Sequence, residues 1–127
     1  MGTNTSSLAR ASALPTVLSS ILSAEDSDEI IEIAERDGWN LALDSVDDQP
    51  AWEKDLAKHR IGELVVIRMR NAISRAFPNV TLTGYKLYVR KFAPEIRASL
   101  PVHTDRSRLS VSLALNEDYE GGDLFYI

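Results

Sequence analysis

Hydrophobic residues recur at helical intervals in two stretches of the chain. The first begins at Ser23–Asp26, which has the form of a capping box, continues as an apolar face, and stops at Gly38. The second runs from Ile61 to Phe77, with apolar residues three and four positions apart, and Pro78 ends it. These periods predict two helices, and we expect the second to pack against a sheet.

Strict alternation between apolar and polar residues predicts strands elsewhere. From Leu109 to Asn116, leucine or valine occupies every second position, and serine, alanine or asparagine occupies the positions between. Such a strand would bury one face in a core and line a cavity with the other, smaller face. Another strand is predicted over Val80–Phe92, where Gly84 breaks the phase as a bulge does. Shorter strands are predicted at 14–22, 39–43 and 123–127.

The remaining stretches lack periodicity and are predicted to be irregular. Residues 1–13 are rich in serine, threonine and alanine, which predicts a disordered arm before one domain over 14–127. Residues 44–50 contain three acids whose spacing does not match an EF-hand, so we expect a solvated loop there, and a second loop at 93–99. Two targeting signals compete with a plain arm: an N-myristoylation site at Met1–Ser6 and an organelle transit peptide.

Composition narrows the class of protein. With 127 residues and a net charge of −5, the chain is long enough for one domain and too acidic to favour nucleic acid as a partner. No apolar run approaches the ~20 residues that a membrane span needs, so we expect a soluble protein, with the cytoplasm favoured. The chain has no cysteine. This excludes disulfides, thiolate zinc sites and cysteine nucleophiles, and leaves oxygen and nitrogen as metal ligands.

His103 and Asp105 are the candidate metal ligands, because a single residue separates them. Successive side chains of an extended strand alternate between faces, so the two would point the same way with Cα atoms about 6.6 Å apart. An imidazole and a carboxylate make two thirds of the 2-His-1-carboxylate triad that holds non-haem Fe(II). The third ligand must lie elsewhere. The other histidine, His59, approaches a predicted helix, and we expect it to be a solvated helix-start residue rather than that ligand.

Tyr88 and Arg90 are candidates for the wall of the cavity. They share a face of the predicted strand at 80–92. A polar sheet face that carries a packed aromatic ring is an equally good interpretation of the same two residues.

Residues 88–127 resemble the core of Fe(II)/2-oxoglutarate-dependent dioxygenases, and most of all the prolyl 4-hydroxylase and procollagen-lysine hydroxylase branch. The resemblance rests on His103-x-Asp105, the strand ending Leu115-Asn116 and the run Tyr-Glu-Gly-Gly-Asp at 119–123. It implies an α+β, mainly β fold, a double-stranded β-helix or cupin-like jelly roll with supporting N-terminal helices. It also implies an oxidoreductase that uses Fe(II) and 2-oxoglutarate, with ascorbate as a further candidate cofactor, to hydroxylate an aliphatic carbon.

The resemblance also implies partners and site residues. The substrate would be a protein or peptide, at a prolyl or lysyl residue, or a small molecule. His103 and Asp105 would bind the metal. Asn116 would shape the site, and joins Tyr88 and Arg90 as a candidate cofactor-binding residue.

The chain departs from the family pattern in two respects. The later histidine ligand of the family, and the basic residue beyond it that grips 2-oxoglutarate, have no counterpart in the 127 residues. Phe92 stands where many relatives carry a tyrosine, and it cannot donate the hydrogen bond of that tyrosine. We therefore expect a truncated fragment that lacks the last strands of the jelly roll and is inactive by itself. The alternatives are a non-catalytic jelly-roll binding module and a cupin-like sugar-binding barrel.

Overall fold

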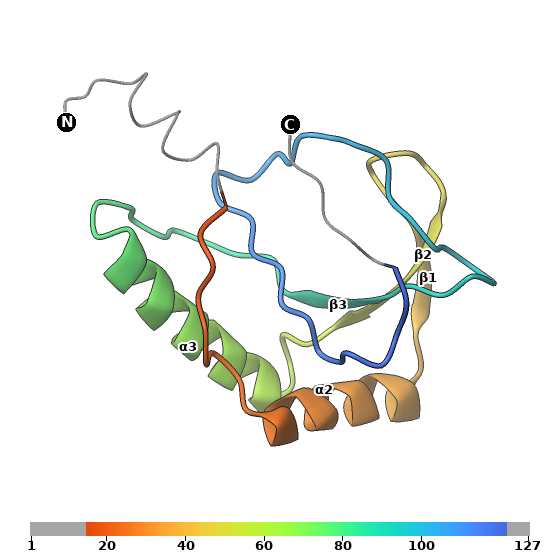
Figure 1. Cartoon of the computed structure of the whole chain (residues 1–127), viewed down its shortest axis with the longest axis horizontal. Helices are drawn as coiled ribbons and strands as arrows, with labels where there is room; N and C mark the ends of the chain where they lie inside the picture. The colour runs from red at the N-terminus through yellow and green to blue at the C-terminus, as the bar shows by residue number, and fades with distance from the viewer. Residues whose placement is uncertain (1–14, 122–127) are drawn as a thin grey trace.

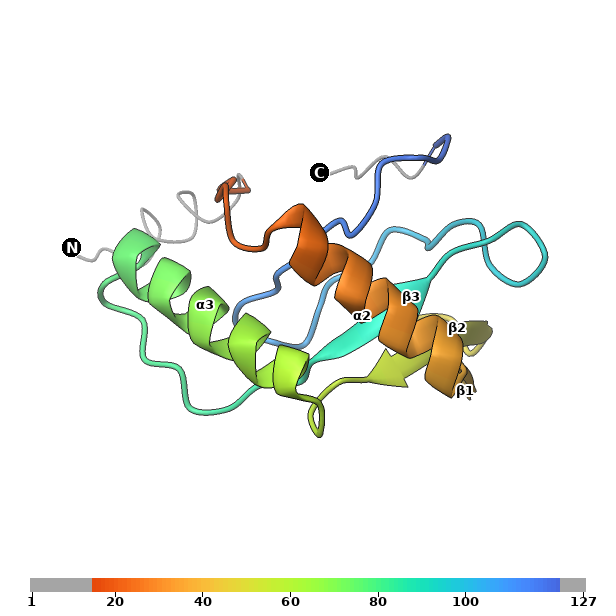
Figure 2. The same cartoon turned by 90° about the horizontal axis from the view of Figure 1, so that it is seen from below.

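The computed structural model of the protein describes residues 15–121, which form two helices and one sheet (Figure 1). In chain order the elements are α2 (Ala24–Asp37), β1 (Asn40–Leu43), β2 (Pro50–Asp55), α3 (Arg60–Ala76) and β3 (Tyr88–Lys91). The three strands are antiparallel and lie in the order β1-β2-β3. Helix α2 lies across one face of this sheet (Figure 2). The predicted α+β class is therefore confirmed, but the expectation of a mainly β fold is not met in the described residues, where the helices contain more residues than the strands.

Local signals set the bounds of α2. Ser23 Oγ accepts a hydrogen bond from the Asp26 N–H at 3.0 Å, and Asp26 Oδ2 accepts one from the Ser23 N–H at 3.2 Å, which completes the predicted capping box. At the other end Gly38 takes a φ of 89°, and its N–H donates to the Ala34 carbonyl at 3.1 Å. Helix α3 also matches its predicted span to within one residue. Both predicted helices are confirmed.

The central strand β2 is not among the strands predicted from the sequence. It starts with a proline and contains three charged residues, which is unusual for the middle of a sheet. Its register with its neighbours runs from Leu43↔Pro50 to Asn40↔Glu53 on one side and from Trp52↔Lys91 to Asp55↔Tyr88 on the other. The strand predicted at 39–43 is confirmed as β1, and the predicted loop that follows connects β1 to β2.

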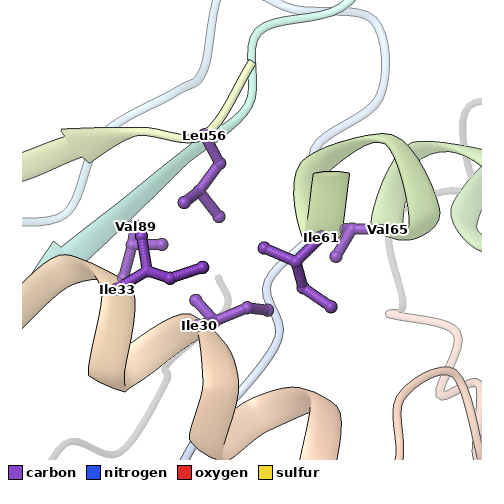
Figure 3. Packing of buried hydrophobic residues seen from close by; sticks show 6 residues of the cluster. All are labelled: Ile30, Ile33, Leu56, Ile61, Val65 and Val89. Atoms are coloured by element: carbon purple, nitrogen blue, oxygen red, sulfur yellow. The ribbon is translucent and has the colours of Figure 1, made fainter. Parts of the chain in front are cut away.

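Six buried apolar side chains from the helices, β3 and the end of β2 form the core (Figure 3): Ile30, Ile33, Leu56, Ile61, Val65 and Val89. Ile30 and Leu56 are 2% and 1% exposed, so both lose nearly all contact with water on folding. Burial of a side chain of this size contributes about 1.5–3 kcal/mol to stability. Leu115, from much later in the chain, is partly buried against this cluster.

Gly62 allows α3 to begin close to the end of β2. A Cβ atom at this position would lie 2.0 Å from the carbonyl oxygen of Leu56. That oxygen also accepts a hydrogen bond from the His59 N–H at 3.0 Å, which holds it in place. A larger residue at 62 must therefore push the start of α3 away from the sheet.

Several predicted strands are wrong. Residues 109–116, and the described part of 14–22, are not strands, and Val80–Phe92 is a strand only at β3. A strand needs a neighbour to receive its N–H and C=O groups, and within residues 15–121 no strand pairs with these segments. Alternation persists in part as burial, because Leu109, Leu113 and Leu115 are half-buried while the residues between them are exposed. Val111, predicted to face the core, is 51% exposed.

Two further predictions lie outside the described residues: the arm at 1–13 and the strand at 123–127. Of the helices in residues 15–121, none is both long enough and apolar enough to cross a bilayer.

Candidate metal centre

His103 and Asp105 lie side by side in the irregular segment that follows the turn at 93–97. The His103 Nε2 atom is 3.0 Å from Asp105 Oδ1, and the two side chains are 27% and 50% exposed. The segment is not a strand, so the strand geometry used to bring these residues together is wrong. The side chains meet nonetheless, at an accessible position where a small ligand can reach them.

The backbone fixes the orientation of the His103 ring. Nδ1 lies 2.7 Å from the carbonyl oxygen of Pro101, and because a carbonyl can only accept, Nδ1 carries the proton and donates it. The other ring nitrogen, Nε2, therefore faces a carboxylate either as a second N–H donor or as a bare lone pair. The Pro101 hydrogen bond, and then the charge of Asp105, raise the pKa of His103 above its ordinary value, which favours the first state. Hydrogen bonding from Ser110, and then the charge of His103, lower the pKa of Asp105.

The two side chains also fit adjacent positions on one divalent ion. Ligand atoms that bind an octahedral ion at 2.0–2.1 Å and at right angles are about 3.0 Å apart, and the distance from Nε2 to Oδ1 is 3.0 Å. A metal-binding histidine commonly donates its second N–H to a carbonyl or carboxylate, as His103 does to Pro101. In the part of the chain that the structure describes, no third His, Cys, Asp or Glu joins the pair.

His59 lies apart from this pair, at the N-cap of α3. Its Nε2 atom is 3.6 Å from Asp37 Oδ2 at the end of α2. This position agrees with the helix-start role expected for it.

Arg90 is held between two carboxylates on the sheet. Its Nη1 atom is 2.6 Å from Asp44 Oδ2, and Nη2 donates to Glu53 on the neighbouring strand. Burial lowers the pKa of Arg90, but the Glu53 hydrogen bond, with smaller contributions from Tyr88 and Asp44, raises it further, so the net direction is upward. The Asp44 contact is an ion pair without hydrogen-bond geometry, because Asp44 Oδ2 has no hydrogen-bond partner among the described residues. Arg90 Nε has no hydrogen-bond partner there either. A 2-oxoglutarate carboxylate would have to compete with both acids for this guanidinium.

Tyr88 and Asn116 occupy separate surroundings. The Tyr88 ring has Lys86 Nζ at 5.0 Å and Arg90 Cζ at 5.3 Å from its centroid, within cation–π range. Tyr88 also lines a cavity of about 370 Å³ on the sheet, together with residues of β1 and β2. Asn116 is exposed, and its Nδ2 donates to Asp118 at 2.7 Å. Neither Arg90 nor Asn116 lines the cavity, so the structure does not gather the three candidate cofactor-binding residues into one pocket.

Arg97 and Asp47 are structurally prominent residues that the sequence patterns do not single out. The Arg97 side chain is 5% exposed and Nη2 lies 2.7 Å from Asp47 Oδ1. The two residues come from the two predicted loops, 50 positions apart in the chain. Hydrophobic periodicity indicates which residues share a face of one helix or strand. It does not indicate which charged residues from two distant loops form an ion pair.

Comparison of the chain with protein-family models, with curated proteins and with solved structures finds no significant match.

Proposed function

We propose that His103 and Asp105 bind Fe(II), and that they are two of the three protein ligands in the metal site of a 2-oxoglutarate-dependent dioxygenase related to prolyl and lysyl hydroxylases. The observation that carries the proposal is the 3.0 Å approach of Nε2 to Oδ1 in a His-x-Asp sequence, with the ring held by the Pro101 carbonyl. On this view the sheet β1-β2-β3 is part of a double-stranded β-helix, with α2 and α3 supporting it from one face.

The residues of the chain have separate tasks in this proposal. His103 would bind the metal through a neutral nitrogen and Asp105 through a carboxylate oxygen. Two ligands leave most positions of a six-coordinate ion open. Bound Fe(II) and 2-oxoglutarate would supply the oxygen chemistry that amino-acid side chains lack, for hydroxylation of an aliphatic carbon. Tyr88, Arg90 and Asn116 remain the candidates for contact with the cosubstrate or with ascorbate.

Two protein ligands give a weaker site than three. Because His59 lies beside Asp37 and no third ligand joins the pair within residues 15–121, we expect the 127-residue protein to bind the metal weakly. Asp44 and Glu53 already form ion pairs with Arg90. We therefore expect Arg90 to bind a carboxylate of 2-oxoglutarate weakly. The protein by itself should then form succinate no faster than free Fe(II) does.

Cosubstrate binding separates a dioxygenase site from a non-catalytic binding module. Calorimetry would titrate 2-oxoglutarate into the protein with and without Mn(II), an oxygen-inert substitute for Fe(II). A dioxygenase site should bind 2-oxoglutarate only with the metal, and His103→Ala should abolish that binding. A binding module would hold the metal weakly or not at all, and would not bind 2-oxoglutarate. If neither ligand binds, or if both bind equally well in His103→Ala, the proposed function is wrong.

A further inference from the structure

Arg97 joins two segments that are far apart in the sequence. Its guanidinium makes a two-pronged contact with Asp47 in the β1–β2 connection, with Nη1 3.0 Å from Oδ2 and Nη2 2.7 Å from Oδ1. The Arg97 residue is only 6% exposed. A paired, nearly buried fork of this kind has one preferred geometry, because both N–H···O bonds must form together.

The same side chain also donates to two backbone carbonyls. Nε donates to the carbonyl of Pro50, the first residue of β2, at 3.1 Å. Nη1 donates to the carbonyl of Ser99 at 3.2 Å. All three guanidinium nitrogens are therefore used, and the chain at Ser99 is fastened to the beginning of the central strand.

The fastened point lies immediately before the candidate metal ligands. Ser99 is two residues before Pro101, whose carbonyl orients the His103 ring. Residues 101–108 are all exposed. Among the described residues, no other hydrogen bond connects residues 98–105 to the sheet or to the β1–β2 connection. Within the described residues, Arg97 therefore supplies the hydrogen bonds that link this segment to the sheet.

We propose that Arg97 is a positioning residue for the His103–Asp105 pair, acting through Ser99 and Pro101, and that Asp47 holds Arg97 in place. The expected effect of Arg97 on metal binding rests on the proposed function. The expected effect of Arg97 on the orientation of the His103 ring does not, because it also applies to the metal-free protein. It makes the β1–β2 connection, more than 50 residues upstream, a determinant of ligand geometry at His103.

The arginine fork makes the inference specific. A lysine at 97 keeps the charge, but its donors radiate from one nitrogen and cannot reproduce the planar fork whose three separate nitrogens contact Asp47, Pro50 and Ser99. Arg97→Lys should therefore impair the site although it preserves charge. Loss of the groups that orient a metal ligand typically weakens metal binding 10–100-fold, and we expect Arg97→Lys to fall in that range.

The test combines a metal readout with a metal-free readout, well below the melting temperature of every variant. Calorimetry would give the Mn(II) dissociation constant of the wild type, Arg97→Lys and Asp47→Asn. NMR of the metal-free proteins would follow the His103 ring, whose signals report the hydrogen bond from Nδ1 to Pro101. Ile30→Val is the matched control, because it loosens the core without touching this segment. We expect weaker Mn(II) binding and altered His103 signals in both Arg97→Lys and Asp47→Asn, and neither change in Ile30→Val.

Each outcome decides the inference. Unchanged His103 signals and unchanged Mn(II) affinity in folded Arg97→Lys would overturn the inference. Arg97 would then only connect the two loops, with no effect on the ligand pair. If Arg97→Lys does not fold, Asp47→Asn decides in its place, because it removes the carboxylate that holds Arg97 while keeping the arginine itself. If the wild type binds no Mn(II), the proposed function fails, and the His103 signals of the metal-free variants still show whether Arg97 positions the ring.

Discussion

Two regions of this molecule differ in what holds them together. The core region, Ala24–Lys91, contains all of the helices and strands of the described structure and all six residues of the core cluster. The ligand segment, Ala98–Gly121, has no helix or strand and is mostly exposed, with Leu115 as its contact with the cluster. The candidate metal ligands lie in the second region. Stability and chemistry are therefore largely separable, except at the contact between Asp47 and Arg97 that joins the core region to the ligand segment.

The largest contrast is expected from the same substitution made in each region. Ile30→Asp places an unpaired carboxylate at a site that is 2% exposed, which should cost about 4 kcal/mol or more and unfold the protein. Val111→Asp replaces a side chain that is 51% exposed and should change stability by about 0.5 kcal/mol or less. Thermal unfolding followed by circular dichroism measures both. Comparable losses would mean that the ligand segment packs as a strand against a core after all.

A smaller effect is expected where α3 meets the end of β2. Gly62→Ala adds a Cβ atom 2.0 Å from the Leu56 carbonyl oxygen, and the required shift should cost about 1–3 kcal/mol despite the better helix propensity of alanine. Gly84→Ala is the control, because a Cβ atom there meets nothing within 4 Å. Urea unfolding gives both free energies. A Gly62→Ala protein as stable as Gly84→Ala would show that α3 does not pack this closely.

The difference between the regions also explains which parts of the fold could be predicted from the sequence. The signals of α2 are local: Ser23, Asp26 and Gly38 satisfy backbone groups within four residues of themselves. A strand depends on a partner that can lie anywhere in the chain. Alternation over 109–116 therefore indicated the half-buried leucines but was wrong for Val111 and did not ensure pairing. Strand β2, in contrast, pairs despite its proline and charges.

The candidate site divides in the same way. The proximity of His103 and Asp105 follows from their spacing, since residues two apart can turn toward each other even outside a strand. The surroundings of Arg90 and Arg97 depend on Asp44, Glu53 and Asp47, which approach from 37 or more positions away. The sequence marks these residues as charged and does not show which of them meet.

The smallest expected effect is a pH dependence at the junction of the two regions. The hydrogen bonds from Arg97 hold the pKa of Asp47 below its usual value of 3.8. A carboxyl group with a lowered pKa in the folded state stabilises the protein above its unfolded pKa, and this contribution disappears as the pH falls through the folded value. The difference in melting temperature between wild type and Asp47→Asn should thus be constant from pH 7 to about pH 5, and shrink below about pH 4.

Asp48→Asn is the matched control for this pH series. Asp48 is exposed, its side chain has no hydrogen bond or ion pair in the described structure, and its φ of 57° also suits asparagine. The melting temperature of the wild type could instead exceed that of Asp47→Asn by the same amount in acid as at pH 7. This result would show that the ionised Asp47 does not hold Arg97.

The central claim is that His103 and Asp105 together bind one divalent cation, and calorimetry with Mn(II) tests it most directly. The wild type should bind one ion weakly. His103→Ala and Asp105→Ala should each abolish the binding, because each removes one of only two protein ligands. His59→Ala should bind as the wild type does, since His59 lies beside Asp37 on a different part of the molecule. Unchanged binding in His103→Ala or Asp105→Ala, or its loss in His59→Ala, would contradict the claim.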